Sequence, residues 1–411
     1  MEAIKSKSEE LMGLEEKYGA HNYHPIPVVL SRGEGVFVWD VEEKKYFDFL
    51  SAYSAVNQGH CHPRLVKVIQ EQASKLTLTS RAFYNDSLGE YEKFITEFFG
   101  FDKVLPMNSG AEAVETSMKL ARKWAYEKKG IPENLAKIIV CHNNFHGRTI
   151  SIISMSSDAD SKNNFGPYTP GFISVPYNDV SAFADALQDP TVCAFLIEPI
   201  QGEAGVIVPD EGYLRETFKL CKAANVLFIA DEIQTGLART GKMLACDHEG
   251  VHPDMLILGK ALSGGFYPVS AVLANDEIML CIQPGQHGST YGGNPLASKL
   301  AIEALKILKE ERLAENADRL GKILRDELRK IKSPLLRTVR GKGLLNAIEI
   351  NEVNGVDAWK VCMSLKENGL LAKPTHGDKI RFAPPLVINE VQIMECVQII
   401  EKVLNNILSK S

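Results

Sequence analysis

Long apolar runs and long basic runs are both missing from this sequence of 411 residues. A membrane-spanning helix needs roughly 20 consecutive apolar residues, so no membrane span is expected. The net charge is −6 and no lysine- or arginine-rich stripe is present, which argues against nucleic acid or an anionic membrane as a partner. With 45% hydrophobic and 24% charged residues, the composition is typical of an ordinary globular enzyme.

Metal-binding and dinucleotide-binding motifs are missing as well. None of the eight cysteines forms a Cys-x-x-Cys pair, a pattern typical of reduced, mostly buried thiols. The pairs His60/His62 and His142/His146 have ligand-like spacing but no cysteine-rich partner, so no metal site is expected. No Gly-x-Gly-x-x-Gly fingerprint follows an expected strand, which argues against a nicotinamide or flavin enzyme.

The first residues carry no recognisable targeting signal. Residues 1–17 lack the apolar core of a secretory signal and are too acidic for a mitochondrial transit peptide. They predict a short amphipathic helix instead. We therefore expect a cytoplasmic location, or a mitochondrial one if a targeting segment has been removed.

Apolar periodicity divides the chain into an α/β part and an α+β part. Strands alternate with helices from about residue 50 to residue 290, which predicts a mainly parallel sheet flanked by helices. Beyond Pro295 the pattern is almost wholly helical, with a break near Arg312, before short strands and a final helix. The expected parts are an N-terminal segment at 1–50 that packs with the small domain, a large domain at 51–294 and a small C-terminal α+β domain at 295–411.

Two apolar segments each end in a single charged residue. Residues 226–230 lead into Asp231 and residues 255–259 into Lys260, and both runs are typical of strands buried in a parallel sheet. Ligands bind outside the carboxyl ends of such strands, so both charges should face one crevice. The small residues at 261–265 predict a flexible loop that leaves space around the amine. Each charge alone could equally belong to a structural ion pair.

Together the two charges suit a carbonyl cofactor. A desolvated lysine has a lowered pKa and attacks carbonyl groups, whereas a carboxylate can keep a pyridoxal ring nitrogen protonated. The turn at 108–111 stands between an expected strand and an expected helix, where free N–H groups favour a phosphate. Phe145 could stack on a planar cofactor and Arg148 could bind a carboxylate. Residues 150–155 are expected to form a further strand.

Residues 227–241 and 253–265 together resemble the signature of the class III pyridoxal-phosphate aminotransferases of fold type I. The similarity covers essentially the whole chain, with further matches at 18–25, 50–63 and 339–345. It implies a large domain on a seven-stranded sheet, pyridoxal 5′-phosphate as cofactor, and a homodimer with active sites at the subunit interface.

The same resemblance implies a role for each cofactor residue. Lys260 would hold the cofactor covalently and later move a proton, while Asp231 would pair with the pyridine nitrogen. Gln234 would hydrogen-bond the ring hydroxyl, and Phe145 would stack on the ring. The residues implied at the phosphate are Ser109, Gly110 and Ala111 of the same chain, with Ser289 and Thr290 from a second subunit.

For the substrates, the resemblance implies L-ornithine and 2-oxoglutarate, converted to L-glutamate 5-semialdehyde and L-glutamate in a ping-pong cycle. Tyr23 and Tyr53 would shape the pocket for the α-amino end of ornithine, with Arg148 as carboxylate partner. Glu203 and Arg381 match a switchable ion pair that opens when 2-oxoglutarate binds. Arg381 could instead be a surface arginine on a strand.

Two alternatives remain open from the sequence. Another class III member would act on N-acetylornithine or 4-aminobutyrate, and the pair Tyr23 and Tyr53 is the feature that would distinguish it. A non-catalytic binding protein that kept the fold is the second alternative. Every expected catalytic position is intact, which speaks against it.

Overall fold

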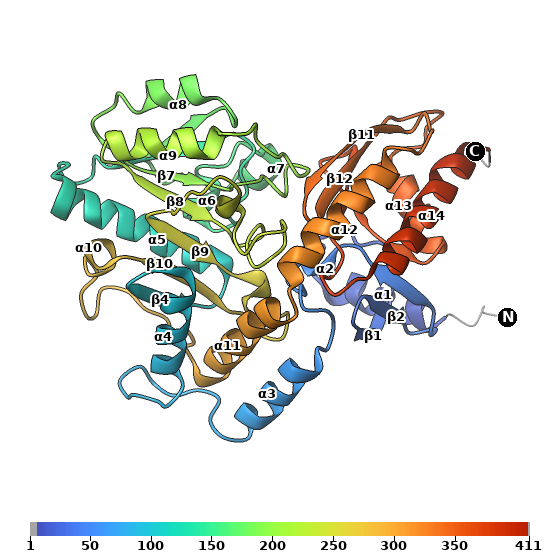
Figure 1. Cartoon of the computed structure of the whole chain (residues 1–411), viewed down its shortest axis with the longest axis horizontal. Coiled ribbons are helices and arrows are strands. Elements are labelled where there is room, and N and C mark those ends of the chain that lie inside the picture. The colour runs from blue at the N-terminus through green and yellow to red at the C-terminus, as the bar shows by residue number, and fades with distance from the viewer. Residues whose placement is uncertain (1–5, 410–411) are drawn as a thin grey trace.

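The computed structural model describes residues 6–409, which form two lobes built around three sheets (Figure 1). The larger lobe holds a seven-stranded sheet in the order β4-β10-β9-β8-β7-β5-β6. All neighbours are parallel except β10, which runs antiparallel to both β4 and β9. The expected mainly parallel sheet is therefore confirmed. Its strands are β4 (Lys103–Met107), β5 (Lys137–Cys141), β6 (Phe172–Val175), β7 (Val192–Ile197), β8 (Leu227–Asp231), β9 (Met255–Leu258) and β10 (Ser270–Ala274).

Helices cover both faces of this sheet. On one face α5 (Gly110–Trp124) packs Val114 and Met118 against the strands, and on the other α8 (Val180–Ala186) and α9 (Tyr213–Ala223) do the same. Strands β7, β8 and β9 are buried along their whole length, as their unbroken apolar runs require. The remaining helices of this lobe are α3 (Pro63–Ala73), α4 (Leu88–Phe99), α7 (Ala159–Lys162) and α10 (Asp276–Met279).

The strand expected at 150–155 is wrong, because these residues form the short helix α6 (Ile150–Ile153) and the turn that follows it. Ile152 and Ile153 are both buried although they are adjacent, whereas Ile150 is exposed. A half-buried strand would alternate instead. The segment packs against α5, where Thr149 donates a hydrogen bond to Glu115. Tertiary packing thus outweighs the strand preference of β-branched residues.

The smaller lobe contains an antiparallel sheet in the order β11-β12-β15-β14, covered by helices. The long helical stretch breaks as expected at Arg312, whose φ of +53° is left-handed. Helix α11 (Pro295–Glu310) still packs against α3 and α4 of the larger lobe. The elements of the smaller lobe that follow are α12 (Leu313–Leu328), β11 (Leu336–Lys342), β12 (Leu345–Ile350), α13 (Ala358–Glu367), β13 (Leu370–Leu371), β14 (Lys373–Thr375), β15 (Lys379–Phe382) and α14 (Glu390–Asn406).

The N-terminal segment shares a sheet with the C-terminal part. Strands β1 (Leu30–Glu34), β2 (Phe37–Asp40) and β3 (Lys45–Asp48) are antiparallel, and β13 adds in parallel to β3. The helix expected near the N-terminus is present as α1 (Lys7–Tyr18), and none of its residues is buried. Residues 1–5 of that expected helix lie outside the described residues. The domain boundaries at 50 and 294 remain predictions.

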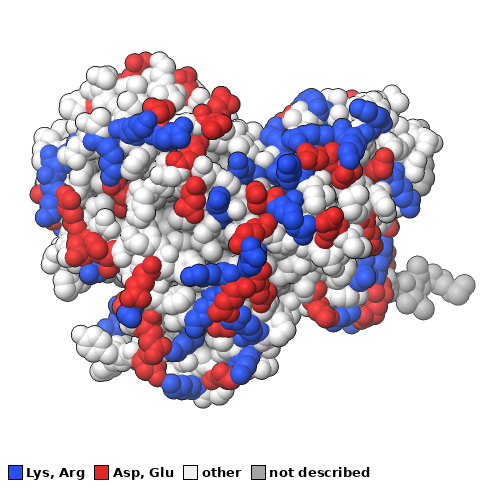
Figure 2. Space-filling model, viewed as in Figure 1, with Lys and Arg blue, Asp and Glu red and all other residues white. Residues whose placement is uncertain are grey.

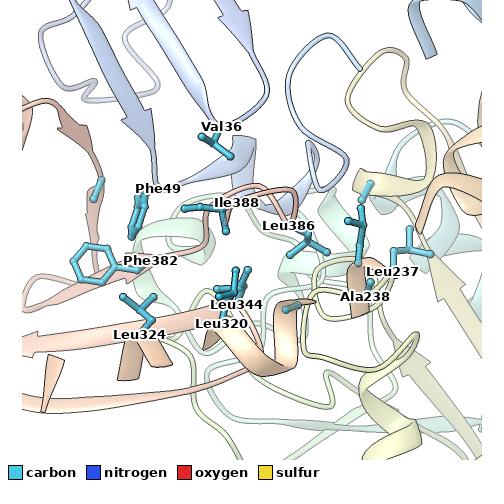
Figure 3. Close-up of a cluster of buried hydrophobic side chains, with 14 of the residues drawn as sticks. Val36, Phe49, Leu237, Ala238, Leu320, Leu324, Leu344, Phe382, Leu386 and Ile388 are labelled. Atoms are coloured by element: carbon cyan, nitrogen blue, oxygen red, sulfur yellow. The ribbon is translucent and has the colours of Figure 1, made fainter. Parts of the chain in front are cut away.

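One apolar core joins the two lobes (Figure 3). Val36 and Phe49 from the N-terminal segment meet Phe382 and Leu386 of the small lobe, and Leu237 comes from the loop after β8. Burying each such side chain contributes about 1.5–3 kcal/mol. The small lobe is therefore packed directly against the loop that follows β8.

Charges of both signs are interspersed over the face shown in Figure 2. Across residues 6–409, no helix combines the length and apolar character needed to cross a bilayer.

Candidate active site

Asp231 and Lys260 lie at the ends of two neighbouring parallel strands and line the same cavity of about 150 Å³. Asp231 is the last residue of β8, and Lys260 comes two residues after β9 ends. Because the two strands are paired, with Asp231 opposite Ile257, both side chains reach the carboxyl edge of the sheet. Gln234, Phe145, Gly110 and Ala111 line the cavity as well, so six of the expected cofactor residues meet there.

The Lys260 amine is enclosed and makes no hydrogen bond or ion pair with any residue between 6 and 409. Burial lowers its pKa, and this outweighs the opposing effect of the Asp231 carboxylate. A lowered pKa raises the fraction of neutral amine, which is the form that attacks a carbonyl.

The prediction of a flexible loop after Lys260 is wrong. Residues Lys260–Ser263 form a 3₁₀ helix whose other three side chains are buried. Gly264 and Gly265 have positive φ, and a Cβ atom on them would come within 2.3 Å of Leu65 and 2.4 Å of Val56. The small residues therefore serve close packing, and the lysine is held on a rigid element.

His146 is a site residue that the sequence did not reveal. Its Nδ1 lies 2.7 Å from Oδ2 of Asp231, and its Nε2 is buried without a partner among the described residues. Burial lowers the pKa of His146, but the hydrogen bond to Asp231 outweighs it, so the net shift is upward. The spacing of His142 and His146 suggested only metal binding, and no cluster of metal-ligating side chains is found among residues 6–409.

Glu198 is a second carboxylate on the cavity wall, directly after β7. Its Oε2 accepts a hydrogen bond of 2.9 Å from the backbone N–H of Phe145, which fixes the position of that residue. Burial raises the pKa of Glu198 to about 7. Glu198 could have been found from the sequence in the same way as Asp231, because it also directly follows an apolar strand.

The expected phosphate turn lies at the start of α5, with Ser109 as N-cap. The Ser109 hydroxyl and the backbone N–H groups of Asn108 and Ser109 are bonded to the Glu112 side chain. The N–H groups of Gly110 and Ala111 remain without partners in the described part of the chain, and both residues line the cavity. A Cβ on Gly110 would come within 2.9 Å of Ile233, so only glycine lets the helix approach this closely.

Glu203 and Arg381 form a buried ion pair at the edge of the cavity. Nη1 of Arg381 lies 2.9 Å from Oε2 of Glu203, and only 2% of the arginine side chain is exposed. The surface-arginine alternative is therefore wrong. Burial raises the pKa of Glu203, but the charge of Arg381 outweighs it and the net shift is downward. The Arg381 guanidinium also lies 5.1 Å from the centre of the Tyr53 ring.

Tyr53 is held in place by a strained turn. Residues Ser51–Ser54 all have left-handed backbone angles, with φ between +48° and +72°. For residues other than glycine this conformation costs roughly 1–2 kcal/mol each. Asp48 stabilises the start of the turn by accepting hydrogen bonds from the N–H groups of Leu50 and Ser51. Strain of this kind is concentrated at functional sites.

The other expected residues lie outside the cofactor cavity. Tyr23 is 62% exposed, with Nζ of Lys373 5.9 Å from its ring. Arg148 lies 5.7 Å from the Phe145 ring and lines a separate cavity of about 410 Å³. Ser289 accepts a hydrogen bond of 2.7 Å from Asn108 of the same chain, and Thr290 is exposed.

A lysine that lines the cavity, a carboxylate on the adjacent strand and a free helix N-terminus define a site built for pyridoxal phosphate on a mainly parallel sheet. Comparison with known families agrees: the description "Aminotransferase class-III" matches residues 18–404, and the chain belongs to this family. The predicted resemblance and its fold class are confirmed. The cofactor is pyridoxal phosphate, and a similar solved structure from Toxoplasma gondii is described with partial occupancy of this group at its active site.

The most similar relatives include several ornithine aminotransferases. The Drosophila ananassae protein is 65% identical over 98% of this chain and 93% of its own, and the Rattus norvegicus protein is 63% identical over 97% and 90%. The ornithine aminotransferase structure from Toxoplasma gondii has a TM-score of 0.97 at 50% identity and covers 99% and 97%. An acetylornithine aminotransferase from Elizabethkingia anophelis has a TM-score of 0.90 at 62% identity and covers 98% and 100%.

The expected cytoplasmic location is contradicted by these relatives. The proteins from Drosophila, Rattus norvegicus and Caenorhabditis elegans are all named as mitochondrial. The reasoning failed because acidic residues at positions 1–17 say nothing about a segment outside the given sequence.

Proposed function

We propose that this protein transfers the δ-amino group of L-ornithine to 2-oxoglutarate, which gives L-glutamate 5-semialdehyde and L-glutamate. The observation that carries the proposal is the identity of 56–65% to ornithine aminotransferases over nearly the whole chain. The buried pair of Glu203 and Arg381 beside Tyr53 supports it, because the pocket must accept an amine in one half-reaction and a dicarboxylate in the other.

Five side chains hold and tune the cofactor in this proposal. Pyridoxal phosphate supplies an electron sink for the carbanion that forms at the amine-bearing carbon. Asp231, which is bonded to His146, would pair with the ring nitrogen, and Gln234 would hydrogen-bond the ring hydroxyl. Phe145, fixed by Glu198, stacks on the ring.

Lys260 both binds the cofactor and moves the proton. Its Nζ reaches the cavity from a rigid 3₁₀ helix and carries no competing hydrogen bond in the described structure, so its lone pair is available as a base. The phosphate is held by the N–H groups of Gly110 and Ala111 and by the Ser109 turn, where the helix dipole favours an anion.

Substrate selection rests on the Glu203–Arg381 pair. With ornithine bound, the pair stays closed and masks the positive charge of Arg381. With 2-oxoglutarate bound, Glu203 moves away and Arg381 binds a carboxylate, for which its buried and unpartnered Nε is suited. Tyr23, Tyr53 and Arg148 contact the α-amino acid end of ornithine.

The active molecule in this proposal is a homodimer. Tyr84 is fully exposed, and Phe83 and Tyr291 are half or more exposed, which is unusual for aromatic side chains. The two segments that carry them lie together, since Arg81 comes within 3.3 Å of a Cβ on Gly293. Ser289 and Thr290 belong to the same surface and would complete the phosphate site of the second subunit.

The acetylornithine aminotransferase from Elizabethkingia anophelis, at 62% identity, supports N-acetylornithine as a second candidate donor. Both donors react through a δ-amine, so they differ only at the α-amino end of the molecule.

Replacing the lysine tests the proposal. Lys260→Ala should abolish glutamate formation from ornithine and 2-oxoglutarate, with a loss of at least about 10³-fold because the base and the covalent anchor disappear together. Borohydride treatment of the wild-type protein should attach the cofactor to Lys260, as detected by peptide mass spectrometry. Unchanged turnover in the variant, or no attachment in the wild type, would reject it.

A further inference from the structure

A second cavity of about 440 Å³ lies beside the cofactor cavity and shares the residues Phe145, His146, Gly147 and Glu203 with it. The opposite wall contains His376 and Lys379 of the small lobe. We propose that this cavity receives the Glu203 carboxylate when it leaves Arg381, and that Lys379 and His376 hold it there. The inference rests on the proposed function, because it concerns the half-reaction that needs Arg381 free.

A displaced Glu203 needs a new partner. Its carboxylate is now bonded to Arg381 and, at 3.4 Å, to the hydroxyl of Thr375. An ionised carboxylate left unpaired at such a partly buried site is strongly destabilised. Binding of a dicarboxylate would therefore be weak unless cationic side chains bind the Glu203 carboxylate after it has left Arg381.

The hairpin of β14 and β15 provides these cations next to the closed pair. It carries Thr375, His376 and Lys379 as well as Arg381. The partners of Glu203 in the closed pair and its proposed partners after displacement therefore belong to the same hairpin. The backbone carbonyl of Glu203 already accepts a hydrogen bond of 2.9 Å from the Thr375 hydroxyl. This bond anchors the main chain, so that only the side chain must turn.

Lys379 lines the same cavity as Glu203. Its side chain crosses Gly205, where a Cβ atom would come within 2.2 Å of Cδ of Lys379. Its Nζ is paired with Asp378, but Asp378 is also paired with Arg337 and keeps a partner if Lys379 turns. Gly205 has a φ of +103°, so only glycine combines this backbone with the close approach of the lysine.

His376 stands at the tip of the hairpin with a left-handed φ of +45°. Neither ring nitrogen has a hydrogen-bond partner among residues 6–409, which leaves a donor free for Glu203. The other acidic residue on the cavity wall, Asp158, is already engaged as the N-cap of α7 and accepts bonds from Asp160 and Ser161. The two basic residues are therefore available to Glu203.

The test measures binding of glutarate, a dicarboxylate that cannot react, to the cofactor-loaded protein by isothermal titration calorimetry. The double variant Lys379→Met with His376→Gly should raise the glutarate Kd about tenfold, because a hydrogen bond to a charged group is lost. Methionine keeps the apolar stem over Gly205, and glycine accepts the left-handed backbone at 376. Lys379→Arg with wild-type His376 should bind glutarate within about twofold of the wild type.

The control repeats the same substitutions in a Glu203→Ala background. There they should leave the glutarate Kd unchanged, because no carboxylate remains to be received. A tenfold loss that persists without Glu203 would show that Lys379 and His376 attract the ligand directly, and this would overturn the proposal. An unchanged Kd in the original double variant would overturn it as well.

Single-turnover kinetics of the two half-reactions separate this proposal from the proposed function. The double variant should convert ornithine at a rate within about twofold of the wild type, while its reaction with 2-oxoglutarate requires about tenfold more substrate. Equal losses in both half-reactions would mean general damage and reject the inference alone. Failure of the wild-type protein to react with ornithine would reject the proposed function instead.

Discussion

At the scale of single residues, the chemistry depends on charges held away from water. Asp231, His146 and Lys260 lie at the carboxyl edge of the sheet, where the Asp231 carboxylate opposes the effect of burial on the pKa of His146 and of Lys260. Glu198 and Glu232 are buried too, and burial raises the pKa of each to about 7. The titration of such residues makes both the stability and the activity of the protein depend on pH.

Glu232 gives a pH prediction that is separate from catalysis. Its ordinary pKa is 4.5, and the folded value of about 7 means that folding favours the protonated form. Its contribution to stability is therefore present below pH 4.5 and is lost as the pH rises to about 7, by roughly 3 kcal/mol. Glutamine at 232 can still accept the hydrogen bond from the Cys246 N–H.

Urea unfolding of the cofactor-free protein checks this at pH 5.0 and pH 7.5. The wild type should lose up to about 3 kcal/mol more unfolding free energy between these values than Glu232→Gln. The same loss in both proteins would show that Glu232 titrates normally in the folded state.

At the scale of elements, the turn Ser51–Ser54 stores strain that can be measured. Ala52 is exposed and left-handed, with a φ of +48°. Ala52→Gly should raise the unfolding free energy by about 0.5–1 kcal/mol, because glycine adopts this conformation without strain. The matched control Ala184→Gly, inside α8, should lower it by about 1 kcal/mol. Thermal unfolding of both variants measures these changes. A decrease in unfolding free energy for both substitutions would contradict the role of strain.

Elements near the cofactor were predictable where local sequence alone sets the structure. The apolar runs before Asp231 and Lys260 are typical of buried strands, and Ser109 followed by Glu112 gives the capping box that starts α5. Helix α6 and the 3₁₀ helix after Lys260 were mispredicted because contacts with α5, Leu65 and Val56 decide their conformation. These contacts are distant in sequence and leave no periodic pattern.

Some of the site residues could likewise be found from the sequence and others could not. Asp231 and Lys260 could be found because each ends an apolar run, whereas the role of His146 depends on a bond between the loop after β5 and the end of β8. Glu198 also stands at a strand end, but its role depends on a bond to the backbone of Phe145. Tyr53 reaches Arg381 only because a strained turn places it there, and the order of residues does not indicate that strain.

At the scale of the whole molecule, the N-terminal segment and the C-terminal part are bound to one another through β3 and β13. The hairpin that carries Arg381 belongs to this joint lobe and lies against the cofactor sheet through the shared core. Relative movement of the lobes would therefore change the distance between Arg381 and the cofactor, which makes their packing part of substrate binding.

The proposed homodimer is also tested at the scale of the whole molecule. Tyr84→Asp should weaken the dimer about 30-fold or more, since a buried aromatic anchor contributes about 2–4 kcal/mol to an interface. Leu135→Asp is the matched control, because Leu135 is 51% exposed in a turn before β5. Sedimentation velocity should show dissociation of the first variant only. A monomeric wild type at micromolar concentration would contradict the proposed homodimer.

The central claim is the choice of ornithine as amine donor, and competition between donors tests it most directly. Purified protein loaded with cofactor is given 2-oxoglutarate with L-ornithine, N-acetylornithine or 4-aminobutyrate, and kcat/KM is measured for each. We expect ornithine to exceed both others by at least about tenfold, or about 1.4 kcal/mol, because acetylation removes the charge and adds bulk at the α-amino end. A higher kcat/KM for N-acetylornithine or 4-aminobutyrate would contradict the claim.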